Sequence, residues 1–417
     1  MAMRLGRNWR TEALRARLAR RLAPDRLDQL WPVTDGTRTT LRSSASPDAQ
    51  DLAGALLRAV PAALAPILAS NAWAISGRHT ESGKPILAND PHLGLRSPAM
   101  WYLARLEAPG FLRVGATVAG LPFTILGHNG HIAWGLTNMP SDTQDLFVER
   151  IDAADAGRYL TPNGPRPFTV RTETIRVKDA DDVALVVRET RHGPVISDAR
   201  PALRAGLRPG HVLALAATAL IPDDRTAEAI YRLNRARGWP AFTAALRLLH
   251  APHQTVTYGD VAGNIGMASP GRVPVRRNGD GAMPVAGWTG DNDWTGFIPF
   301  DELPQVLNPP SGRVVAANQR PVGPAYPHFL GRDWPPGYRA RRIYALLDTD
   351  ATGRTGHNAA ASAAMQMDRN SAMARDLLPL MLAPAAADAA SRTALALLAR
   401  WDGDMDRDRP EPLIFTA

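Results

Sequence analysis

The stretch that decides the fold is Ile67-Leu68-Ala69-Ser70-Asn71-Ala72-Trp73-Ala74-Ile75-Ser76. An Ala-rich segment with helical tendency runs into Ala69, and an alternating strand pattern begins directly after it. A serine hydroxyl is a weak nucleophile at neutral pH and needs a base. An α-amino group titrates at roughly 7.7–8.0, so a serine freed at a new N-terminus would carry its own base. The alternative for Ser70 is an ordinary strand start.

Downstream of Ser70 the sequence predicts strands interleaved with helices. Strand patterns are expected at 72–76, 85–88, 123–126, 132–134, 167–196 and 256–266, the last around a Gly-Asn turn. The first two form a hairpin that starts with Ser70, and residues 89–93 are predicted as a sharp polar turn. Helices are expected at 8–31, with a break at Pro24-Asp25, and at 225–250, 338–348 and 357–400. This alternation favours a layered α+β fold.

Composition excludes some functions. The 417 residues are 45% hydrophobic and contain no cysteine, so there is no disulfide, thiolate metal site or cysteine nucleophile. The net charge of +8 comes from scattered arginines, and the arginines of the first helix are expected at the surface. A nucleic-acid binder would interleave basic patches with aromatic residues, a pattern that is not found. No apolar run of ~20 residues predicts a membrane span, and the first ten residues lack the apolar core of a signal peptide.

Several dispersed motifs occur in an order that resembles the penicillin acylase family of N-terminal-nucleophile (Ntn) amidohydrolases. They are Ser70-Asn71-Ala72-Trp73, Asn89-Asp90-Pro91-His92-Leu93, Gly127-His128-Asn129-Gly130, Trp134-Gly135, Gly263-Asn264-Ile265-Gly266, Ala317-Asn318-Gln319-Arg320-Pro321 and Trp401-Asp402-Gly403. Each motif alone is weak, but the ordered set covers almost the whole chain. In that family the protein cuts the bond before the serine, and the freed serine becomes the catalyst.

The resemblance implies an α+β fold with the four-layer αββα core of Ntn hydrolases, truncated at both ends. Residues 1–32 would be the helical end of an α-chain and 33–69 the removed spacer. Residues 70–345 would form the β-chain core and 346–417 a helical, truncated β-chain region. Cleavage would give an α-chain/β-chain heterodimer from a zymogen. The family implies a periplasmic or secreted location, and a fragment of this length is expected to be inactive alone.

The resemblance also implies the catalytic residues. Ser70 would be the nucleophile, and the oxyanion would be held by the main-chain N–H of Asn138 and the side chain of Asn318. His92 falls where some family members have a histidine close to the nucleophile, and Arg339 where the family has an arginine beside the asparagine and the α-amine. The alternatives are turn-forming roles for Asn318 and His92 and plain surface charge for Arg339.

The family's acyl pocket maps to Leu93, Leu126 and Pro140. All three are apolar, which predicts an aromatic or aliphatic acyl group. Acylases that prefer glutaryl groups have an arginine near Leu126, so an anionic acyl chain is not expected. Penicillin-type amides, acyl-homoserine lactones and lipopeptides remain open as small-molecule substrates.

A structural Ca²⁺ ion is implied by the spacing of Asp142, Gln144 and Asp145. This spacing resembles the family's calcium loop, with two carboxylates and the main-chain carbonyl of the middle residue, and oxygen ligands suit a hard cation. The family's third β-chain carboxylate has no clear counterpart near Leu330, and a further ligand belongs to an α-chain region expected to be absent. His128 and His131 could suggest zinc, but no acidic third ligand accompanies them.

The sequence leaves three functions to be considered. The first is an autoprocessed amidohydrolase, the second is an inactive homologue that acts as a binding or scaffold protein, and the third is an arginine-rich nucleic-acid binder. Retention of Ser70, Asn71 and Asn318 together favours the first. The absence of a G-x-S-x-G motif disfavours an α/β-hydrolase.

Overall fold

The computed structural model describes residues 8–19, 21–31, 69–94, 97–204, 206–348, 356–383 and 388–416. Apart from Ala69, the predicted spacer at 33–69 lies outside these ranges. None of the helices within them is long and apolar enough to cross a membrane.

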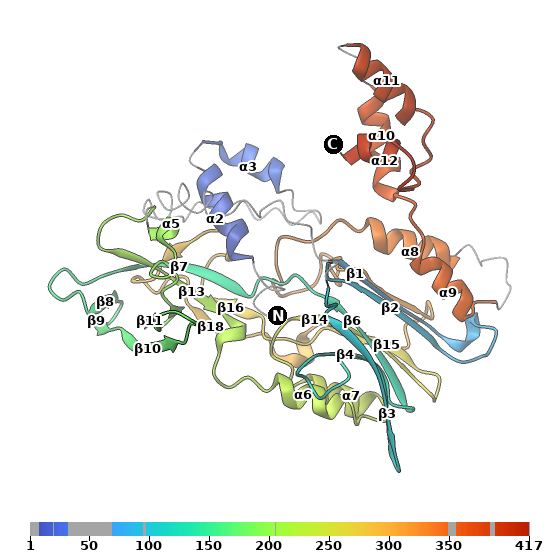
Figure 1. Ribbon diagram of the computed structural model, residues 1–417, viewed down its shortest axis with the longest axis horizontal. Coiled ribbons are helices and arrows are strands. Elements are labelled where there is room, and N and C mark those ends of the chain that lie inside the picture. Colours follow the sequence, from blue (N-terminus) through green and yellow to red (C-terminus); the bar gives the residue numbers. More distant parts are fainter. Residues whose placement is uncertain are drawn as a thin grey trace.

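Two antiparallel sheets face each other at the centre of the molecule (Figure 1). The three-stranded sheet has the order β2-β1-β20 and consists of β1 (Ala69–Ile75), β2 (Ile86–His92) and β20 (Arg313–Ala316). The seven-stranded sheet has the order β19-β15-β14-β6-β5-β4-β3. Its strands are β3 (Trp101–Ala108), β4 (Phe111–Val118), β5 (Leu126–His128), β6 (Ile132–Asn138), β14 (Gln254–Asp260), β15 (Ile265–Ala268) and β19 (Gln305–Leu307). Ala74, Ile265 and Val314 are buried between the sheets.

Helices cover the outer face of each sheet, so the layer order is helix, sheet, sheet, helix (Figure 1). Helices α8 (Tyr338–Asp348) and α9 (Ala359–Gln366) pack on the three-stranded sheet, where Ile343 and Leu347 meet Trp73. Helices α6 (Thr226–Leu233) and α7 (Trp239–Leu246) pack on the seven-stranded sheet, where Phe242 meets Tyr258. The predicted four-layer α+β core is confirmed.

The N-terminal helices pack on a third sheet, of order β13-β7-β17. Its strands are β7 (Gln144–Arg150), β13 (His211–Ala217) and β17 (Val285–Ala286), with the short helix α5 (Pro201–Arg204) beside β13. Helix α2 (Trp9–Leu18) lays Trp9 and Ala13 against β7, and α3 (Pro24–Leu30) follows the predicted break. The expectation of solvated arginines is wrong for Arg15, which is buried, pairs with Asp333 and stacks over Trp31.

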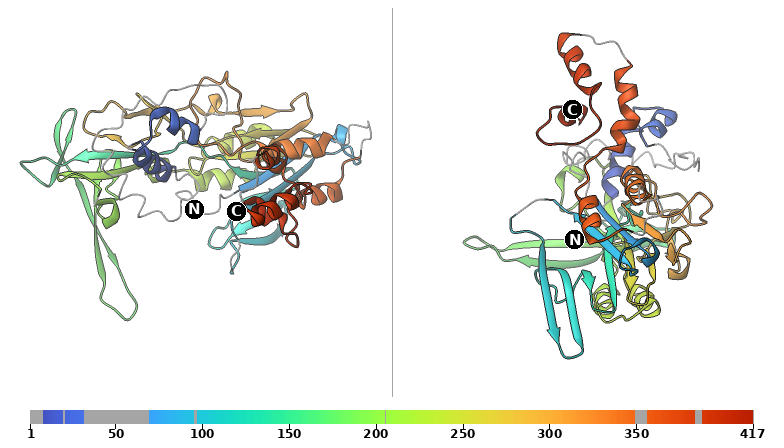
Figure 2. Two further views of the ribbon diagram at one scale, coloured as in Figure 1. Left: turned by 90° about the horizontal axis from the view of Figure 1, so that it is seen from above. Right: turned by 90° about the vertical axis from the view of Figure 1, so that its right-hand side faces the viewer.

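Smaller elements extend from this core. Figure 2 shows the hairpin of β10 (Thr169–Ile175) and β11 (Val183–Thr190) projecting from one end and the β3–β4 hairpin from another side. The remaining short strands are β8 (Arg158–Thr161), β9 (Gly164–Pro167), β12 (Gly193–Pro194), β16 (Pro274–Arg276) and β18 (Trp294–Phe297). Helices α10 (Ala372–Leu382), α11 (Ala389–Leu398) and α12 (Glu411–Thr416) form a separate projecting cluster around Trp401.

One local prediction is wrong in an informative way. Residues 89–92 do not form a turn, because β2 continues through them to His92 and pairs with β1 along its whole length. The polar side chains of Asn89 and Asp90 suggested a turn, but each bonds to a partner across the ladder or on the facing sheet. Tertiary hydrogen bonds thus override the local turn propensity of this sequence.

Candidate active site

Ser70 is the second residue of β1, the central strand of the three-stranded sheet, and it is buried. Its hydroxyl donates to the carbonyl oxygen of Ala69, the preceding residue, at 2.7 Å. Pro91 of β2 lies opposite Ser70 in the ladder, and His92 lies opposite Ala69. The serine is therefore fixed on a sheet rather than on a loop, with its oxygen at the carbonyl that precedes it.

Asn318 reaches Ser70 from the other neighbouring strand, because it follows the end of β20 by two residues. Its Oδ1 accepts the main-chain N–H of Ser70 at 2.8 Å, and its Nδ2 donates to the carbonyl oxygen of Asn138 at 2.6 Å. Asn318 has φ of +65°, a left-handed conformation that asparagine tolerates better than most side chains do. This conformation ends the strand pairing and turns the amide toward the serine.

Arg339 projects from the start of α8 and donates to three acceptors around Ser70. Its Nη1 lies 2.7 Å from the carbonyl oxygen of Ser70 and 2.6 Å from Oδ1 of Asn71, and its Nη2 lies 2.9 Å from Oδ1 of Asn318. Burial lowers the pKa of this guanidinium, while the charge of Asp90 raises it. The arginine predicted as either catalytic or surface charge is thus at the serine.

Asn138 ends β6 and lies opposite Gln254 of β14. Its main-chain carbonyl accepts from Asn318, and its side-chain Oδ1 accepts from Nε2 of the buried Gln254 at 3.2 Å. The same nitrogen of Gln254 also donates to the carbonyl oxygen of His253 at 3.0 Å. Gln254 thereby fixes the residue predicted for the oxyanion site, and no motif in the sequence indicated it.

Asn89 joins the strand of the serine to the strand of Asn138. Its Nδ2 donates to the carbonyl oxygens of Asn71, at 2.7 Å, and Leu136, at 3.1 Å, and its Oδ1 accepts the N–H of Leu136 at 2.9 Å. A Cβ atom on Gly135 would lie 2.8 Å from Asn89, so glycine is needed there for this contact. The side chain of Asn89 therefore links the two facing sheets by hydrogen bonds.

His92 is the one predicted catalytic residue whose side chain is largely exposed. Its Nε2 lies 3.3 Å from Oδ2 of Asp90, two residues earlier on the same face of β2. Burial raises the pKa of Asp90, while the hydrogen bond from Asn71 and the charge of His92 lower it. A chain of polar contacts therefore runs from His92 through Asp90 to Asn71, the neighbour of Ser70.

The three predicted pocket residues are all half-buried. Leu93 directly follows β2, Leu126 begins β5, and Pro140 follows β6 by two residues. Leu93 lies next to His92, which pairs with Ala69 of β1, whereas β5, which carries Leu126, pairs with β4 and β6. Their role as an acyl pocket stays a prediction. His128 and His131, by contrast, line a surface cleft of about 420 Å³ with Lys84, Pro85 and Val261, at the hairpin turns.

Asp142 and Asp145 are buried at the start of β7, and a third carboxylate joins them from helix α2. This is Glu12, whose oxygens lie within 4.8 Å of those of the two aspartates. Its Oε2 accepts the N–H of Leu146 at 3.1 Å. The sequence interpretation missed Glu12 because leucines every four residues suggested another buried face of the helix.

A guanidinium lies among these carboxylates. Arg276, at the end of β16, donates from Nη2 to Asp142 and Asp145, at 2.8 Å each, and from Nε to Asp145 at 2.7 Å. Burial raises the pKa of Glu12 and of Asp142 well above the ordinary range, with the neighbouring aspartates adding to the effect. Burial alone would lower the pKa of Arg276, but the charges of Asp145 and Asp142 outweigh it, so the pKa of this guanidinium is raised overall.

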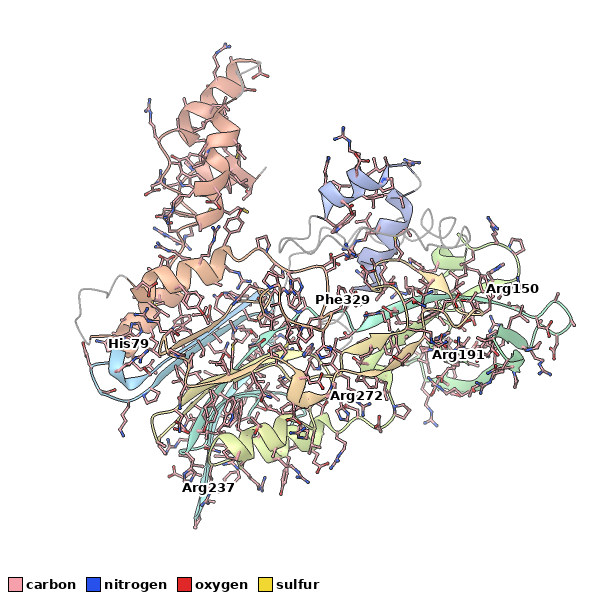
Figure 3. All side chains as sticks on the ribbon, turned by 180° about the vertical axis from the view of Figure 1, so that it is seen from behind. His79, Arg150, Arg191, Arg237, Arg272 and Phe329 are labelled. Atoms are coloured by element: carbon pink, nitrogen blue, oxygen red, sulfur yellow. The ribbon has the colours of Figure 1, made fainter. Side chains whose placement is uncertain are left out.

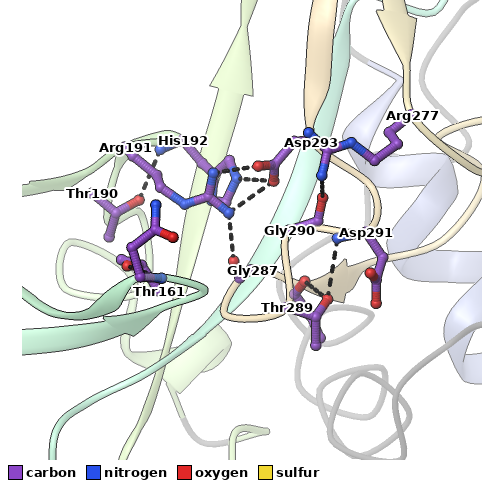
Figure 4. Close-up of polar contacts among 12 residues, drawn as sticks. Thr161, Thr190, Arg191, His192, Arg277, Gly287, Thr289, Gly290, Asp291 and Asp293 are labelled. Carbon is purple, nitrogen blue, oxygen red and sulfur yellow. Dashed lines mark hydrogen bonds and ion pairs between the residues drawn. The ribbon is translucent and has the colours of Figure 1, made fainter.

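A second buried ionic cluster lies at the far end of β7, where His192 bridges Glu149 and Asp293. Figure 4 draws His192, Arg191 and Asp293 of this cluster. Its Nδ1 lies 2.6 Å from Glu149 and its Nε2 3.0 Å from Asp293, and its ring stacks on Phe147 at 3.7 Å between centroids. Arg191 also pairs with Asp293 and donates to the carbonyl oxygen of Gly287. Arg191 is far from His79, which marks the tip of the β1–β2 hairpin (Figure 3).

The chain is similar in sequence to known proteins. The family described as Penicillin amidase matches residues 1–417. An acyl-homoserine lactone acylase QuiP of Pseudomonas fluorescens (strain Pf0-1) is 35% identical over 316 residues, 76% of this chain and 38% of the relative. The penicillin acylase 2 proenzyme of Pseudomonas sp. (strain SE83) is 35% identical over 279 residues, 67% of this chain and 35% of the relative.

A solved structure shows the same fold. The thermostable penicillin G acylase from Alcaligenes faecalis superposes with a TM-score of 0.69 at 25% identity, covering 83% of this chain and 62% of that one. The chain thus spans little more than a third of the length of the two curated relatives. Family match, fold and the arrangement around Ser70 agree, and the chain belongs to the penicillin amidase family.

Proposed function

We propose that Ser70 is the nucleophile of an amidohydrolase that cleaves N-acyl amides and that becomes active when the chain cuts its own Ala69–Ser70 bond. The observation that carries the proposal is the convergence of Asn318 and Arg339 on Ser70 from separate elements. Two relatives named as acylases, one for acyl-homoserine lactones and one a penicillin acylase proenzyme, support the class of reaction.

In the cleavage step the hydroxyl oxygen of Ser70 attacks the carbonyl carbon of Ala69, and its proton passes to the nitrogen of Ser70. The C–N bond breaks, which frees the α-amine of Ser70 and leaves Ala69 as an ester on Oγ, and water then hydrolyses the ester to a carboxylate on Ala69 and a free serine hydroxyl. Ser70 Oγ donates to the oxygen of that carbonyl at 2.7 Å, which keeps the hydroxyl beside the scissile group, and it has to turn from the oxygen to the carbon before it attacks. Holding reacting groups in place in this way removes much of the entropic part of a barrier.

In turnover the α-amine of Ser70 accepts the proton of its own hydroxyl while Oγ attacks the substrate carbonyl. Asn318 has two amide hydrogens, of which one is given to Asn138, so the other is free to meet the oxyanion. The main-chain N–H of Asn138 is the second donor in this scheme. The α-ammonium then protonates the leaving amine, and water hydrolyses the acyl-serine.

Arg339 has two roles in the proposal. It fixes Oδ1 of Asn318, which aims the amide hydrogens, and its positive charge beside Ser70 disfavours protonation of the α-amine. An amine with a lowered pKa remains a free base near neutral pH. Leu93, Leu126 and Pro140 would hold an aromatic or aliphatic acyl group, with penicillin-type amides and acyl-homoserine lactones as the substrate classes.

The test uses intact mass, N-terminal sequencing and amide hydrolysis by the complete protein. Ser70→Ala should abolish both cleavage at Ala69–Ser70 and turnover, whereas the matched control Ser76→Ala, directly after the same strand, should retain both. Ser70→Cys should retain slow cleavage, because the thiol that it introduces is also a nucleophile. Normal hydrolysis by the Ser70→Ala variant would refute the assignment, and correct folding without any turnover in the wild type would favour the binding or scaffold alternative.

A further inference from the structure

The carboxylate cluster of Glu12, Asp142 and Asp145 has the residue types of a divalent cation site. A metal ligand must direct a free lone pair at the ion, at 2.3–2.6 Å in the case of calcium. The arrangement of N–H donors around these oxygens therefore decides whether the residues fit an ion.

The lone pairs of Asp145 are directed at N–H groups. Its Oδ1 accepts from Nη2 of Arg276 at 2.8 Å. Its Oδ2 accepts from Nε of Arg276 at 2.7 Å and from Nε1 of Trp294 at 2.6 Å. A cation placed here would meet donor hydrogens rather than lone pairs.

The other two predicted ligands are also engaged, by Asn8 just before helix α2. Its Nδ2 lies 2.6 Å from Oδ1 of Asp142 and 2.7 Å from the main-chain carbonyl oxygen of Gln144. That carbonyl is the one predicted to bind calcium. The amide thus contacts both a carboxylate and the carbonyl from the side of the N-terminal helix.

The backbone holds Arg276 in this position. Strand β16 pairs with β18, with a bulge between Val275 and Arg276 that places Arg276 opposite Trp294. Bulges commonly re-aim a side chain, and here both partners of the pair donate to Asp145. Gly281 packs directly against this pair, and no side chain would fit there, because a Cβ atom would lie 2.4 Å from Oδ1 of Asp145 and 2.8 Å from Nη2 of Arg276.

From this geometry we propose that the guanidinium of Arg276 is the resident cation of the cluster and takes the place of a calcium ion. Its planar fork supplies directed hydrogen bonds to two carboxylates at once, which a spherical ion does not. The neighbouring arginines are engaged elsewhere, Arg15 with Asp333 and Arg332 with Asp280. The disposition of these residues therefore does not fit the calcium ion that the loop spacing suggests.

The test measures melting temperature and bound calcium, with no activity assay. The wild-type Tm should be the same in EDTA and in millimolar CaCl₂, and equilibrium dialysis with radioactive calcium should show no stoichiometric binding. Arg276→Met keeps the aliphatic stem and removes the donors. Its Tm should fall by roughly 3–6 °C, as expected for one broken buried pair in a chain of this size, and calcium should restore much of that loss.

The matched control is Arg332→Met, because Arg332 is as buried as Arg276, with 4% of each side chain exposed, and also pairs with an aspartate. It should lower Tm without creating a calcium response. If Arg276→Met does not fold, Arg276→Gln repeats the measurement with a smaller loss of donors. A wild-type Tm that rises with calcium, or a folded Arg276 variant that gains no calcium response, would overturn the proposal.

Discussion

Oδ1 of Asn318 accepts the main-chain N–H of Ser70 at 2.8 Å across 248 positions of sequence. The same amide donates to the carbonyl oxygen of Asn138 through Nδ2, so one side chain links the serine to β6, the strand that ends at Asn138. In the proposed mechanism the two ends of the amide have separate roles: the oxygen positions the serine, and the nitrogen is the donor for the reaction.

Replacing Asn318 by alanine should lower the acylation rate constant by roughly 10²–10³-fold, the usual loss for one oxyanion donor. Asn318→Asp keeps the acceptor for Ser70 and loses the donor, so it should show a loss of similar size. Gln319→Ala, which changes the neighbouring turn only, should leave the rate nearly unchanged. Single-turnover kinetics with a chromogenic acyl amide measure all three, and an unaltered rate in Asn318→Asp would show that Asn318 has a structural role alone.

Arg339→Met should change the pH dependence of hydrolysis as well as its rate. Removal of a positive charge next to Ser70 favours the protonated α-amine, so the pKa of the base rises. The acid limb of kcat/KM against pH should therefore shift to higher pH relative to wild type. Arg341→Met, two residues further along α8 on an exposed pair with Asp376, provides the control profile. A shift to lower pH in Arg339→Met would contradict the proposed role.

Leu126 gives a test of acyl specificity. Phenylacetyl or medium-chain acyl amides should be hydrolysed faster than glutaryl amides, because an unpaired carboxylate is costly to bury. Leu126→Arg should reverse this order by supplying a partner for the glutaryl carboxylate. The measurement is the ratio of kcat/KM for the two substrates, and Leu126→Met is the control of similar volume. A wild-type preference for glutaryl amides would show that the pocket has been mapped wrongly.

His192 predicts a pH-dependent stability. Burial alone would lower its pKa, but hydrogen bonds with Asp293 and Glu149 raise it, and Arg191 opposes them. Since the folded-state pKa lies above the unfolded value of roughly 6.5, the stabilisation is complete below about that pH and is lost as pH rises through the folded pKa. His192→Gln should therefore lower Tm most at mildly acidic pH and least at alkaline pH.

The control for that experiment is His328→Gln, because His328 pairs with Glu302 in a more exposed setting. Its Tm difference from wild type should be small at every pH. Thermal unfolding followed by circular dichroism over the same pH series measures both variants. A Tm difference for His192→Gln that grows with rising pH would have the wrong sign for a protonated bridge.

Ser70 and Asn318 could be singled out because each lies in a short motif with a chemical reason, whereas Arg339 lies in no quoted motif and was indicated only by the family resemblance. Gln254 and Asn89 were not predicted as site residues, since their roles depend on which strands face each other. The helix at 338–348 was predicted with its observed bounds because its pattern is local. The polar run 89–92 was misread as a turn because its hydrogen-bond partners lie on β1 and on the facing sheet.

The same limit explains Glu12 and Arg276. The sequence of α2 predicts a buried leucine face, but contacts with β7 bury Glu12 and Ala13 instead. Arg276 lies in a run with another arginine and no motif, and only the pairing of β16 with β18 shows where its side chain points. Local patterns specify the elements, whereas the partners of a charged side chain depend on contacts between distant segments.

The packing of α2 on β7 has a consequence for the mature protein. If the chain is cut before Ser70, the helix is no longer covalently joined to the strand it covers. Its contacts, which include Trp9 with Leu146 and the pair of Arg15 with Asp333, would then be the interface between two polypeptides. The α-chain helix would be a subunit that dilution can remove, and the ionic cluster beneath it would govern how slowly it dissociates.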